Sequence, residues 1–578
     1  MPASLFDPGR IGPVKTRNRV LMASMTTRCA DDEGFVTPNT IAYYKARAEG
    51  GVGLITVEMA APERCGRHRR FELGIYDDRF LPGLTELVSV IHAAGAKASI
   101  QLGHGGGHTR EDICGEAPIA PSAIPHVVQE FTTETIIPEE MTPARIEQTI
   151  AAHIAAAVRA RAAGFDAVEI HSAHGYLLSQ FHTPFENRRT DEWGGSLRNR
   201  ARFSLEITRR VKEAVPDLAV IFRITVDDFF PEGLQLEDGV QIAVWASEGG
   251  ADAIHVAAGH YRSLPSSIGM IPPMSKPEGA FLPFARAVKA RVKVPVIAVA
   301  RLGNPELAAS ALADGTCDFI ALGRPLLADE KWVAKAQAGQ PVRRCLACNT
   351  CINIMREGNR LQCLVNARTG REIEFGPDNQ AMPHGKRIAV IGAGPAGLSY
   401  ASLVAAGNTV TVFERTHKSG GSLRHAALAP RFQDVESAPD AFERYFTSLV
   451  RICETSGVTI HYGTDVVRNR HLLADYDLIV VASGAKYRFG LGPLAAMALE
   501  SGIARWSLPK RLFDRADVRN WLYYKARQGT GAEIAKLARP GQEVIIIGDA
   551  AQAGKSQAAI SQAFQAALLG KHVVARPQ

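Results

Sequence analysis

The sequence predicts an α/β protein in which an N-terminal (β/α)8 TIM barrel precedes a Rossmann-like domain. Eight short apolar runs alternate with longer amphipathic segments between residues 19 and 325, which is the element order of that barrel. A strand, a glycine-rich turn, a helix and a second strand follow one another in residues 386–415. Between these two patterns, residues 345–363 hold four of the nine cysteines of the 578-residue chain.

The predicted barrel strands are rich in β-branched residues and are short enough to be strands. The segments between them, such as PARIEQTIAAHIAAAVRARAAG, repeat apolar residues three and four apart, as amphipathic helices do. The predicted strands are residues 19–25, 52–59, 97–104, 167–174, 219–227, 253–260, 295–301 and 319–325.

Polar side chains occupy the C-terminal ends of these strands. They are Thr26, Glu58, Gln101, His104, His171, His174, Arg223, His260, Arg301 and Arg324. Active sites of this fold lie on that rim, so the pattern predicts one here. The loops after the seventh and eighth strands commonly hold a phosphate, and we expect Arg301, Gly323 and Arg324 to bind it.

The four clustered cysteines, Cys345, Cys348, Cys351 and Cys363, are separated by two, two and eleven residues. A sparse and odd number of cysteines in a long chain indicates a reducing compartment and argues against a disulfide scaffold. Structural zinc usually takes two separated pairs, whereas three thiolates in one turn and a distant fourth are typical of an iron–sulfur cluster. The spacing therefore favours a 4Fe-4S cluster, with zinc as the alternative.

The composition is that of an ordinary globular protein, with 46% hydrophobic and 22% charged residues. The net charge of +7 is spread along the chain without a basic tract, which argues against nucleic-acid binding. The N-terminal residues lack the apolar core of a signal peptide, and no apolar run approaches the roughly 18 residues of a membrane span. We therefore expect a cytoplasmic protein that binds neither nucleic acid nor membrane.

A dinucleotide-binding pattern lies in KRIAVIGAGPAGLSYASLVAAGNTVTVFER, residues 386–415. Gly392, Gly394 and Gly397 separate the first strand from the helix, and Glu414 ends the second strand. Glycines let the backbone approach a pyrophosphate, and the acidic residue is placed to bind a ribose hydroxyl. Strand, helix and carboxylate together make the prediction specific.

The stretch EIHSAHGYLLSQFHTPFENRRTDEWGGSLRNRARF, residues 169–203, strongly resembles the signature of the Old Yellow Enzyme family of FMN barrels. NRVLMASM and IQLGHGG fit the same family at the first and third strands. With the four cysteines and the nucleotide-binding domain, the chain resembles the large iron–sulfur branch that contains 2,4-dienoyl-CoA reductase and trimethylamine dehydrogenase. The resemblance implies three cofactors: FMN, a 4Fe-4S cluster, and FAD or ADP in its place.

The resemblance implies flavin contacts for four residues of the rim. Gln101 is expected to bind the pyrimidine edge, and Arg223 is expected to lie by N1 and O2, where positive charge stabilises the reduced flavin. Met25 and Thr26 are expected to line the flavin beside N5.

Four further residues are implied to be catalytic. His171 and His174 match the pair that holds the carbonyl or other anionic head of a substrate lying over the flavin. Tyr176 matches the proton donor, because a phenol can protonate the carbon alpha to a carbonyl while hydride reaches the beta carbon. His260 aligns with a histidine that dienoyl-CoA reductase uses.

The C-terminal segment EVIIIGDAAQAGKSQAAISQAFQAA, residues 543–567, resembles the closing part of two-dinucleotide-binding flavoproteins, where Asp549 would contact the ribitol side of FAD. Relatives that use NAD(P)H insert a second Rossmann subdomain before this segment. Residues 486–542 contain no second glycine fingerprint, so direct NAD(P)H oxidation is in doubt. We expect an external electron carrier or partner subunit of the ferredoxin, flavodoxin or electron-transferring flavoprotein type.

Two directions of electron flow fit this cofactor set. In the first, the enzyme reduces an activated C=C bond of an enone, enoate or enoyl thioester. In the second, it is an amine dehydrogenase or N-demethylase that oxidises an N-methyl substrate and exports electrons through the cluster. Met59 and Met355 stand where trimethylamine dehydrogenase has an aromatic cage for a cation, which favours the reductase. An electron-relay subunit is a third interpretation, against which the complete rim argues.

The predicted organisation has four parts. They are an FMN barrel (1–340), a cluster segment (341–376), a linker (377–386) and a dinucleotide domain without a full NAD(P)H subdomain (387–578). We also expect the chain to form a homo-oligomer.

Overall fold

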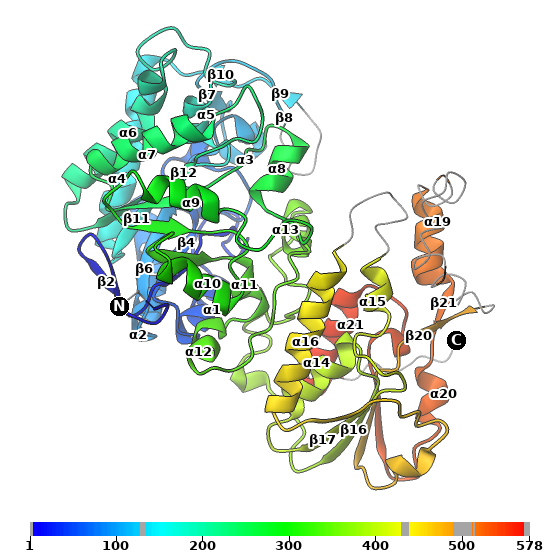
Figure 1. Cartoon of the computed structure of the whole chain (residues 1–578). Coiled ribbons are helices and arrows are strands. Elements are labelled where there is room, and N and C mark those ends of the chain that lie inside the picture. Colours follow the sequence, from blue (N-terminus) through cyan, green and yellow to red (C-terminus); the bar gives the residue numbers. More distant parts are fainter. Residues whose placement is uncertain are drawn as a thin grey trace. The chain divides into compact units, whose positions relative to one another are not determined.

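The computed structural model describes residues 4–127, 135–428, 438–488 and 515–571, together with Met497 and Arg511. The chain divides into two compact units (Figure 1). The barrel unit comprises Met1–Gln337 and Asn349–Gln362, and the C-terminal unit comprises Ala338–Cys348 and Cys363–Gln578. The chain therefore passes three times between the units around the cysteine segment, and the four-part organisation stays a prediction.

Eight parallel strands close into a barrel, which confirms the predicted fold. They are β3 (Val20–Met22), β4 (Leu54–Ala61), β6 (Lys97–Leu102), β11 (Ala167–Ser172), β12 (Ala219–Thr225), β13 (Ala253–Ala257), β14 (Val296–Ala298) and β15 (Phe319–Leu322). Each pairs with its neighbours in chain order, and β3 pairs with both β15 and β4, so the sheet has no open edge between them. The two-residue β5 (Leu73–Gly74) extends the end of β4.

Helices follow most strands and surround the barrel in Figure 1. They are α1 (Pro38–Glu49), α2 (Leu81–Ala93), α4 (Pro143–Ala162), α6 (Leu197–Ala214), α7 (Leu236–Glu248), α9 (Leu282–Lys289), α10 (Pro305–Ala313) and α11 (Arg324–Ala328). The helix start signals in the sequence act as expected, since Thr142 and Ser196 accept hydrogen bonds from the amides of Arg145 and Asn199.

One end of the barrel is filled by apolar side chains, among them Leu54, Ile221, Ile297 and Phe319. The hairpin of β1 (Gly9–Ile11) and β2 (Val14–Thr16) contributes Ile11 and Val14 to this cluster. Such layers make the interior a packed core and leave the opposite, C-terminal end for polar groups.

Shorter elements build that C-terminal rim. After β6 come η3 (Gly106–His108), α3 (Glu111–Cys114), β7 (Ile119–Ala120), β8 (His126–Val127), β9 (Thr135–Ile136) and β10 (Glu139–Glu140). Helix α5 (Leu177–His182) follows β11, and α8 (Leu264–Met270) follows β13. The short helices α12 (Trp332–Gln337) and α13 (Thr350–Arg356) complete this unit.

The C-terminal unit contains a five-stranded parallel sheet in the order β18, β17, β16, β19, β22. Its strands are β16 (Arg387–Ile391), β17 (Thr409–Phe413), β18 (Thr459–His461), β19 (Leu478–Val481) and β22 (Glu543–Ile546). Helices α14 (Pro395–Val404) and α16 (Pro439–Thr455) pack with this sheet, and α21 (Ser556–Leu569) packs against α14. The order reverses beside β16, which is the switch point where a dinucleotide binds in this fold.

Short elements lie in or beside residues 486–542, the segment in which no second nucleotide-binding subdomain is expected. They are β20 (Ala485–Tyr487), α19 (Ala516–Asn520), β21 (Arg527–Gly529) and α20 (Gly531–Ala535). Most of residues 489–514 lie outside the described residues, so that expectation stays a prediction.

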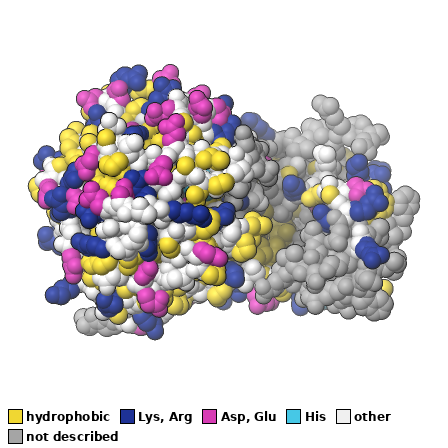
Figure 2. Space-filling view, turned by 90° about the horizontal axis from the view of Figure 1, so that it is seen from above, with side chains coloured by type: hydrophobic (Ala, Val, Ile, Leu, Met, Phe, Trp, Pro, Cys, Tyr) yellow, Lys and Arg dark blue, Asp and Glu magenta, His cyan; other side chains and the backbone are white. Residues whose placement is uncertain are grey.

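Charges of both signs are interspersed on the barrel face seen in Figure 2. Ion pairs join many of them, as Arg209 shows with Glu206 at 2.8 Å and with Glu213 at 2.6 Å. Among the described residues, no helix is both long and apolar enough to cross a membrane.

Candidate active site

Strand ends of the barrel bring the predicted flavin residues to one rim. Gln101 lies on β6 and Arg223 on β12, while Met25 and Thr26 follow β3. The first and eighth strands meet here, because a Cβ added at Gly323 would lie 2.9 Å from the sulfur of Met25. Because Gly323 has no side chain, the loop after β3 can approach the end of β15.

Glu169 on β11 connects the two polar flavin residues, and the sequence analysis did not select it. Its Oε1 accepts a hydrogen bond of 2.7 Å from Gln101 Nε2 and lies 3.6 Å from Arg223 Nη1. Its Oε2 lies 2.6 Å from His255 Nδ1. Arg223 Nε is buried without a hydrogen-bond partner among the described residues, so it is a donor left for a bound group such as a flavin.

The pKa of Glu169 yields a testable pH dependence. Burial alone would raise this pKa, but His255 and Arg223 hold it at about 2. We expect Glu169→Gln to lower the free energy of unfolding at pH 7 by roughly 1.5–3 kcal/mol, the usual contribution of hydrogen bonds to a charged group. Because the folded-state pKa lies below the ordinary 4.5, this contribution is complete above that pH and is lost as the pH falls toward 2.

Urea unfolding of both proteins between pH 7 and pH 2.5 measures this contribution. The difference in the free energy of unfolding between wild type and Glu169→Gln should become smaller as the pH falls. Glu213→Gln, on the exposed face of α6, is the control and should change stability little at any pH. A difference that stays constant down to the lowest pH would contradict the assignment.

The predicted substrate residues gather at the end of β11. The rings of His171 and His174 have centroids 5.2 Å apart, and the Tyr176 ring lies 5.2 Å from that of His171. His174 adopts a φ of 68°, which turns the chain at the strand end, and its amide donates to Thr225 Oγ1 at 2.8 Å. Burial and then Arg223 lower the pKa of both histidines well below 6.5, so both are neutral at pH 7.

Tyr176 is buried and has two polar neighbours that the sequence analysis missed, Tyr261 and Arg69. Its hydroxyl lies 3.5 Å from that of Tyr261. Arg69 is within hydrogen-bonding reach of the same hydroxyl and acts to lower its pKa. Burial nevertheless raises the pKa of Tyr176 well above 10, so the side chain remains a protonated phenol at neutral pH.

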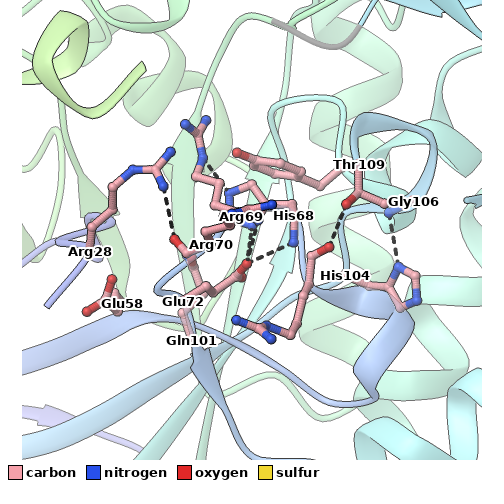
Figure 3. A network of polar contacts seen from close by, with 12 residues as sticks. Arg28, Glu58, His68, Arg69, Arg70, Glu72, Gln101, His104, Gly106 and Thr109 are labelled. Carbon is pink, nitrogen blue, oxygen red and sulfur yellow. Dashed lines mark hydrogen bonds and ion pairs between the residues drawn. The ribbon is translucent and has the colours of Figure 1, made fainter. Parts of the chain in front are cut away.

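A short buried network holds Arg69 in this position (Figure 3). Glu72 Oε2 accepts hydrogen bonds from the amides of His68 and Arg69 at 2.8 and 3.1 Å and lies 2.8 Å from His68 Nδ1. Arg69 Nε donates to His68 Nε2 at 2.9 Å, which places the imidazole proton on Nδ1, facing Glu72. The run HRRFE, residues 68–72, is the sequence feature from which this network could have been predicted.

His260 lies at the end of β13 and is fully buried. Its backbone bridges to that of His174. Its Nε2 faces Glu186 Oε2 at 3.2 Å, and its Nδ1 accepts from the amide of Arg262 at 3.0 Å. Its predicted catalytic role remains a prediction.

The predicted phosphate residues lie at adjacent strand ends. Arg301 follows β14 and donates to the carbonyl of Pro273 at 2.7 Å. Arg324 begins α11 and donates to the carbonyl of Pro272 at 3.0 Å. The two guanidinium groups thus reach consecutive residues of one loop, and their predicted pairing around an anion stays a prediction.

In the C-terminal unit, the glycine-rich turn has the form that the sequence predicts. Gly392 has a φ of 110°, and a Cβ at Gly397 would lie 2.0 Å from the carbonyl oxygen of Gly392, so a side chain there would prevent the turn. Glu414 Oε2 accepts from the amide of Ala393 at 2.9 Å, which fixes the carboxylate beside the turn. Gly394 precedes the first residue of α14.

Asp549 lies in η10 (Gly548–Ala550), directly after the end of β22. Its Oδ1 accepts from the amide of Gly554 at 3.1 Å, and its Oδ2 pairs with Arg527. The residue therefore stands at the carboxyl end of the sheet, as a role beside FAD requires.

The four clustered cysteines belong to different units. Cys351 lies on α13 of the barrel unit, and Cys345, Cys348 and Cys363 belong to the C-terminal unit. The amide of Ala347 donates to Cys345 Sγ at 3.3 Å, an interaction that stabilises a thiolate. That the four cysteines bind one iron–sulfur cluster stays a prediction.

A polar rim on a TIM barrel, with a buried phenol, neutral histidines and a cation for a reduced ring, defines a flavin-dependent oxidoreductase. The chain belongs to the NADH:flavin oxidoreductase / NADH oxidase family, whose sequence profile matches residues 4–343. The pyridine nucleotide-disulphide oxidoreductase profile matches residues 386–498. The family and the two-domain arrangement confirm the resemblance to the large flavoprotein branch of the Old Yellow Enzyme family, with FMN and a second nucleotide of the FAD or NAD type.

Relatives of known activity differ in what they act on. The chain is 37% identical to the NADH oxidase of Thermoanaerobacter brockii, over 84% of this chain and 73% of that protein. It is 32% identical to N,N-dimethylglycine/sarcosine dehydrogenase of Chromohalobacter salexigens, over 84% and 69%. It is 30% identical to cinnamate reductase of Clostridium sporogenes, over 94% and 82%.

A solved structure shares the fold over nearly the whole chain. It is 2-naphthoyl-CoA reductase, with a TM-score of 0.83 and 24% identity, over 97% of this chain and 98% of that one. At this identity the likeness shows the fold alone.

Proposed function

We propose that this enzyme is an FMN, 4Fe-4S and FAD oxidoreductase that reduces an activated C=C bond conjugated to a carbonyl or carboxylate. The observation that carries the proposal is the placement of Arg69 at the phenol of Tyr176, on a rim that already holds Arg223. Two guanidinium groups attract an oxygen anion and repel an ammonium substrate.

The carboxylates of this rim are already engaged. Glu58 accepts from the amide and hydroxyl of Thr27 at 2.7 and 2.6 Å, and burial raises its pKa to about 8, so it is largely neutral at pH 7. Glu72 is bound to His68, and Glu169 is bound to His255. These carboxylates therefore do not compensate the charge of an amine substrate.

The chain's own residues supply the proton side of the proposed reaction. Bound FMN provides the hydride that reaches the beta carbon. His171 and His174, both neutral, hold the substrate oxygen through an N–H each, which withdraws electrons from the double bond. Tyr176 donates its proton to the alpha carbon, and Arg69 and the hydroxyl of Tyr261 stabilise the phenolate that this leaves.

We expect Arg69→Met to raise KM for an enoate such as cinnamate by at least about tenfold, because a charge-assisted hydrogen bond of roughly 1.5–3 kcal/mol is lost. For an uncharged enone the KM should change much less, although kcat falls with the loss of phenolate stabilisation. Steady-state kinetics on both substrates measures the difference. Arg70→Met is the control, since the neighbouring Arg70 is exposed and pairs with Asp112. Equal effects of the two variants would contradict the proposed role of Arg69.

Oxidation of an N-methyl amino acid is the second candidate, favoured by the identity to N,N-dimethylglycine/sarcosine dehydrogenase. Such a substrate also carries a carboxylate that Arg69 could bind. Anaerobic mixing of the oxidised enzyme with N,N-dimethylglycine and sarcosine separates the two candidates. Bleaching of the FMN absorbance by these amines, without turnover of enones or enoates, would overturn the reductase proposal.

The cluster and the external electron carrier complete the proposed route. We infer that Cys345, Cys348, Cys351 and Cys363 bind the 4Fe-4S cluster and that FAD or ADP occupies the Gly392–Gly397 turn. Electrons then come from a ferredoxin, flavodoxin or electron-transferring flavoprotein, and the chain forms a homo-oligomer.

A further inference from the structure

A second group of buried titratable side chains lies beside the predicted catalytic residue His260. It consists of His108 in η3, His126 in β8 and Glu186 after α5, with His260 beside them; we call it the histidine–glutamate cluster. These four residues are between 0% and 8% exposed. Two of the four, His108 and His126, come from the loop after β6, so the cluster joins this loop to the ends of α5 and β13.

The geometry of the cluster suits a metal ion. One potential ligand atom from each of His108, His126 and Glu186 lies within 4.8 Å of the others. The rings of His108 and His126 are perpendicular, with centroids 5.3 Å apart, and His126 Nδ1 lies 3.5 Å from Glu186 Oε1. Tetrahedral zinc at about 2.1 Å from two imidazole nitrogens places the ring centroids roughly 5 Å apart.

Hydrogen bonding leaves the cluster incomplete. His108 Nε2, His126 Nε2 and Glu186 Oε2 are all buried, and none has a hydrogen-bond partner among the described residues. Glu186 Oε2 forms an ion pair with His260 Nε2 at 3.2 Å, so the two other imidazole nitrogens are the atoms that this pair leaves unsatisfied. Several unpartnered polar atoms within one buried site are costly, and a bound cation would satisfy them together.

A comparison within the same unit shows what a cluster without a metal looks like. Glu63, Cys65 and His104 also lie within 4.8 Å of one another. There, however, Arg145 donates to Glu63 at 2.9 Å and to Cys65 Sγ at 2.8 Å, so a guanidinium already supplies the positive charge. In the histidine–glutamate cluster the nearby Arg262 instead stacks on Phe185, with 4.1 Å between its guanidinium carbon and the ring centroid.

We propose that His108, His126 and Glu186 bind one Zn²⁺ ion. Two imidazoles and a carboxylate are a ligand set that zinc accepts in proteins. The ring of His108 also contacts that of Tyr261, with centroids 5.6 Å apart. The ion therefore fixes the wall of the pocket that positions Tyr261 beside Tyr176.

The test is metal analysis of the full-length protein after purification without chelators. About one zinc per chain is expected beside the iron, with nitrogen and oxygen neighbours at about 2.0–2.1 Å and no sulfur in zinc-edge X-ray absorption. Protein without zinc that still binds none from added Zn²⁺, or zinc with sulfur neighbours, would overturn the proposal.

Substitutions of the proposed zinc ligands provide a second test. His126→Asn and Glu186→Gln should each lose most of the zinc while keeping iron and FMN. The matched control is His153→Asn, because His153 on α4 is equally buried but bonds to the carbonyl of Thr149. Retention of zinc in His126→Asn and Glu186→Gln would contradict the ligand assignment, and the wild-type measurement stands if a variant does not fold.

Discussion

Tyr176→Phe is expected to slow turnover of an enone or enoate by roughly two to four orders of magnitude, the usual size of a general-acid contribution. The substitution removes only the hydroxyl, and the ring keeps its packing against His171 and Tyr261 at 5.2 and 5.5 Å. The variant should bind FMN and undergo photoreduction as the wild type does. Single-turnover oxidation of the reduced flavin by the substrate measures the effect.

The neighbouring tyrosine provides a graded comparison. Tyr261→Phe removes one donor to the phenolate and should cost much less, since the proton source and Arg69 remain. A wild-type pH profile that stays flat through neutral pH is also expected, because burial raises the pKa of Tyr176 well above 10. Full activity of Tyr176→Phe on a true substrate would show that another group donates the proton.

The barrel could be predicted because its signals repeat along the chain. Each of the eight strands lies within the residues predicted for it or within two residues of them, as for β4 at Leu54–Ala61 against the predicted 52–59. Parallel strands buried on both faces are continuous apolar runs, so their limits follow from the first polar residue. The rim was predictable for the same reason, since Gln101, His171 and Arg223 stand near the ends of those runs.

The residues that complete the site were not predictable in this way. Arg69 and His68 lie in a loop after β4, where no periodicity fixes the direction of a side chain, and Glu72 orients both through hydrogen bonds. Tyr261 reaches Tyr176 from a position 85 residues further along the chain. Only the closed barrel, which brings the ends of β11 and β13 together, shows that these groups share one site.

Electron transfer gives the second large expected effect. Cys348→Ser should abolish electron exchange with a reduced ferredoxin or flavodoxin, because serine replaces one of four thiolates that the cluster needs. The wild type, prepared anaerobically, should contain about four irons with equivalent labile sulfide per chain, and the variant should lose both. The barrel unit should keep its FMN, since the FMN residues lie on strands that do not include the cysteine segment.

The same substitution at Cys453 is the matched control. Cys453 is fully buried on α16 of the C-terminal unit, and its thiol contacts the carbonyl of Leu398 at 3.4 Å, so Cys453→Ser changes sulfur chemistry without touching the four clustered cysteines. Stopped-flow mixing with NADH and NADPH should give slow flavin reduction of equal rate in wild type, Cys348→Ser and Cys453→Ser. A reduced ferredoxin or flavodoxin should reduce the wild type and the Cys453 variant much faster than NADH and NADPH do. The net charge of +7 favours an acidic carrier. Wild-type protein without iron and sulfide, or rapid saturable reduction by NAD(P)H that depends on Cys348, would contradict this route and would place a nicotinamide site in the C-terminal unit.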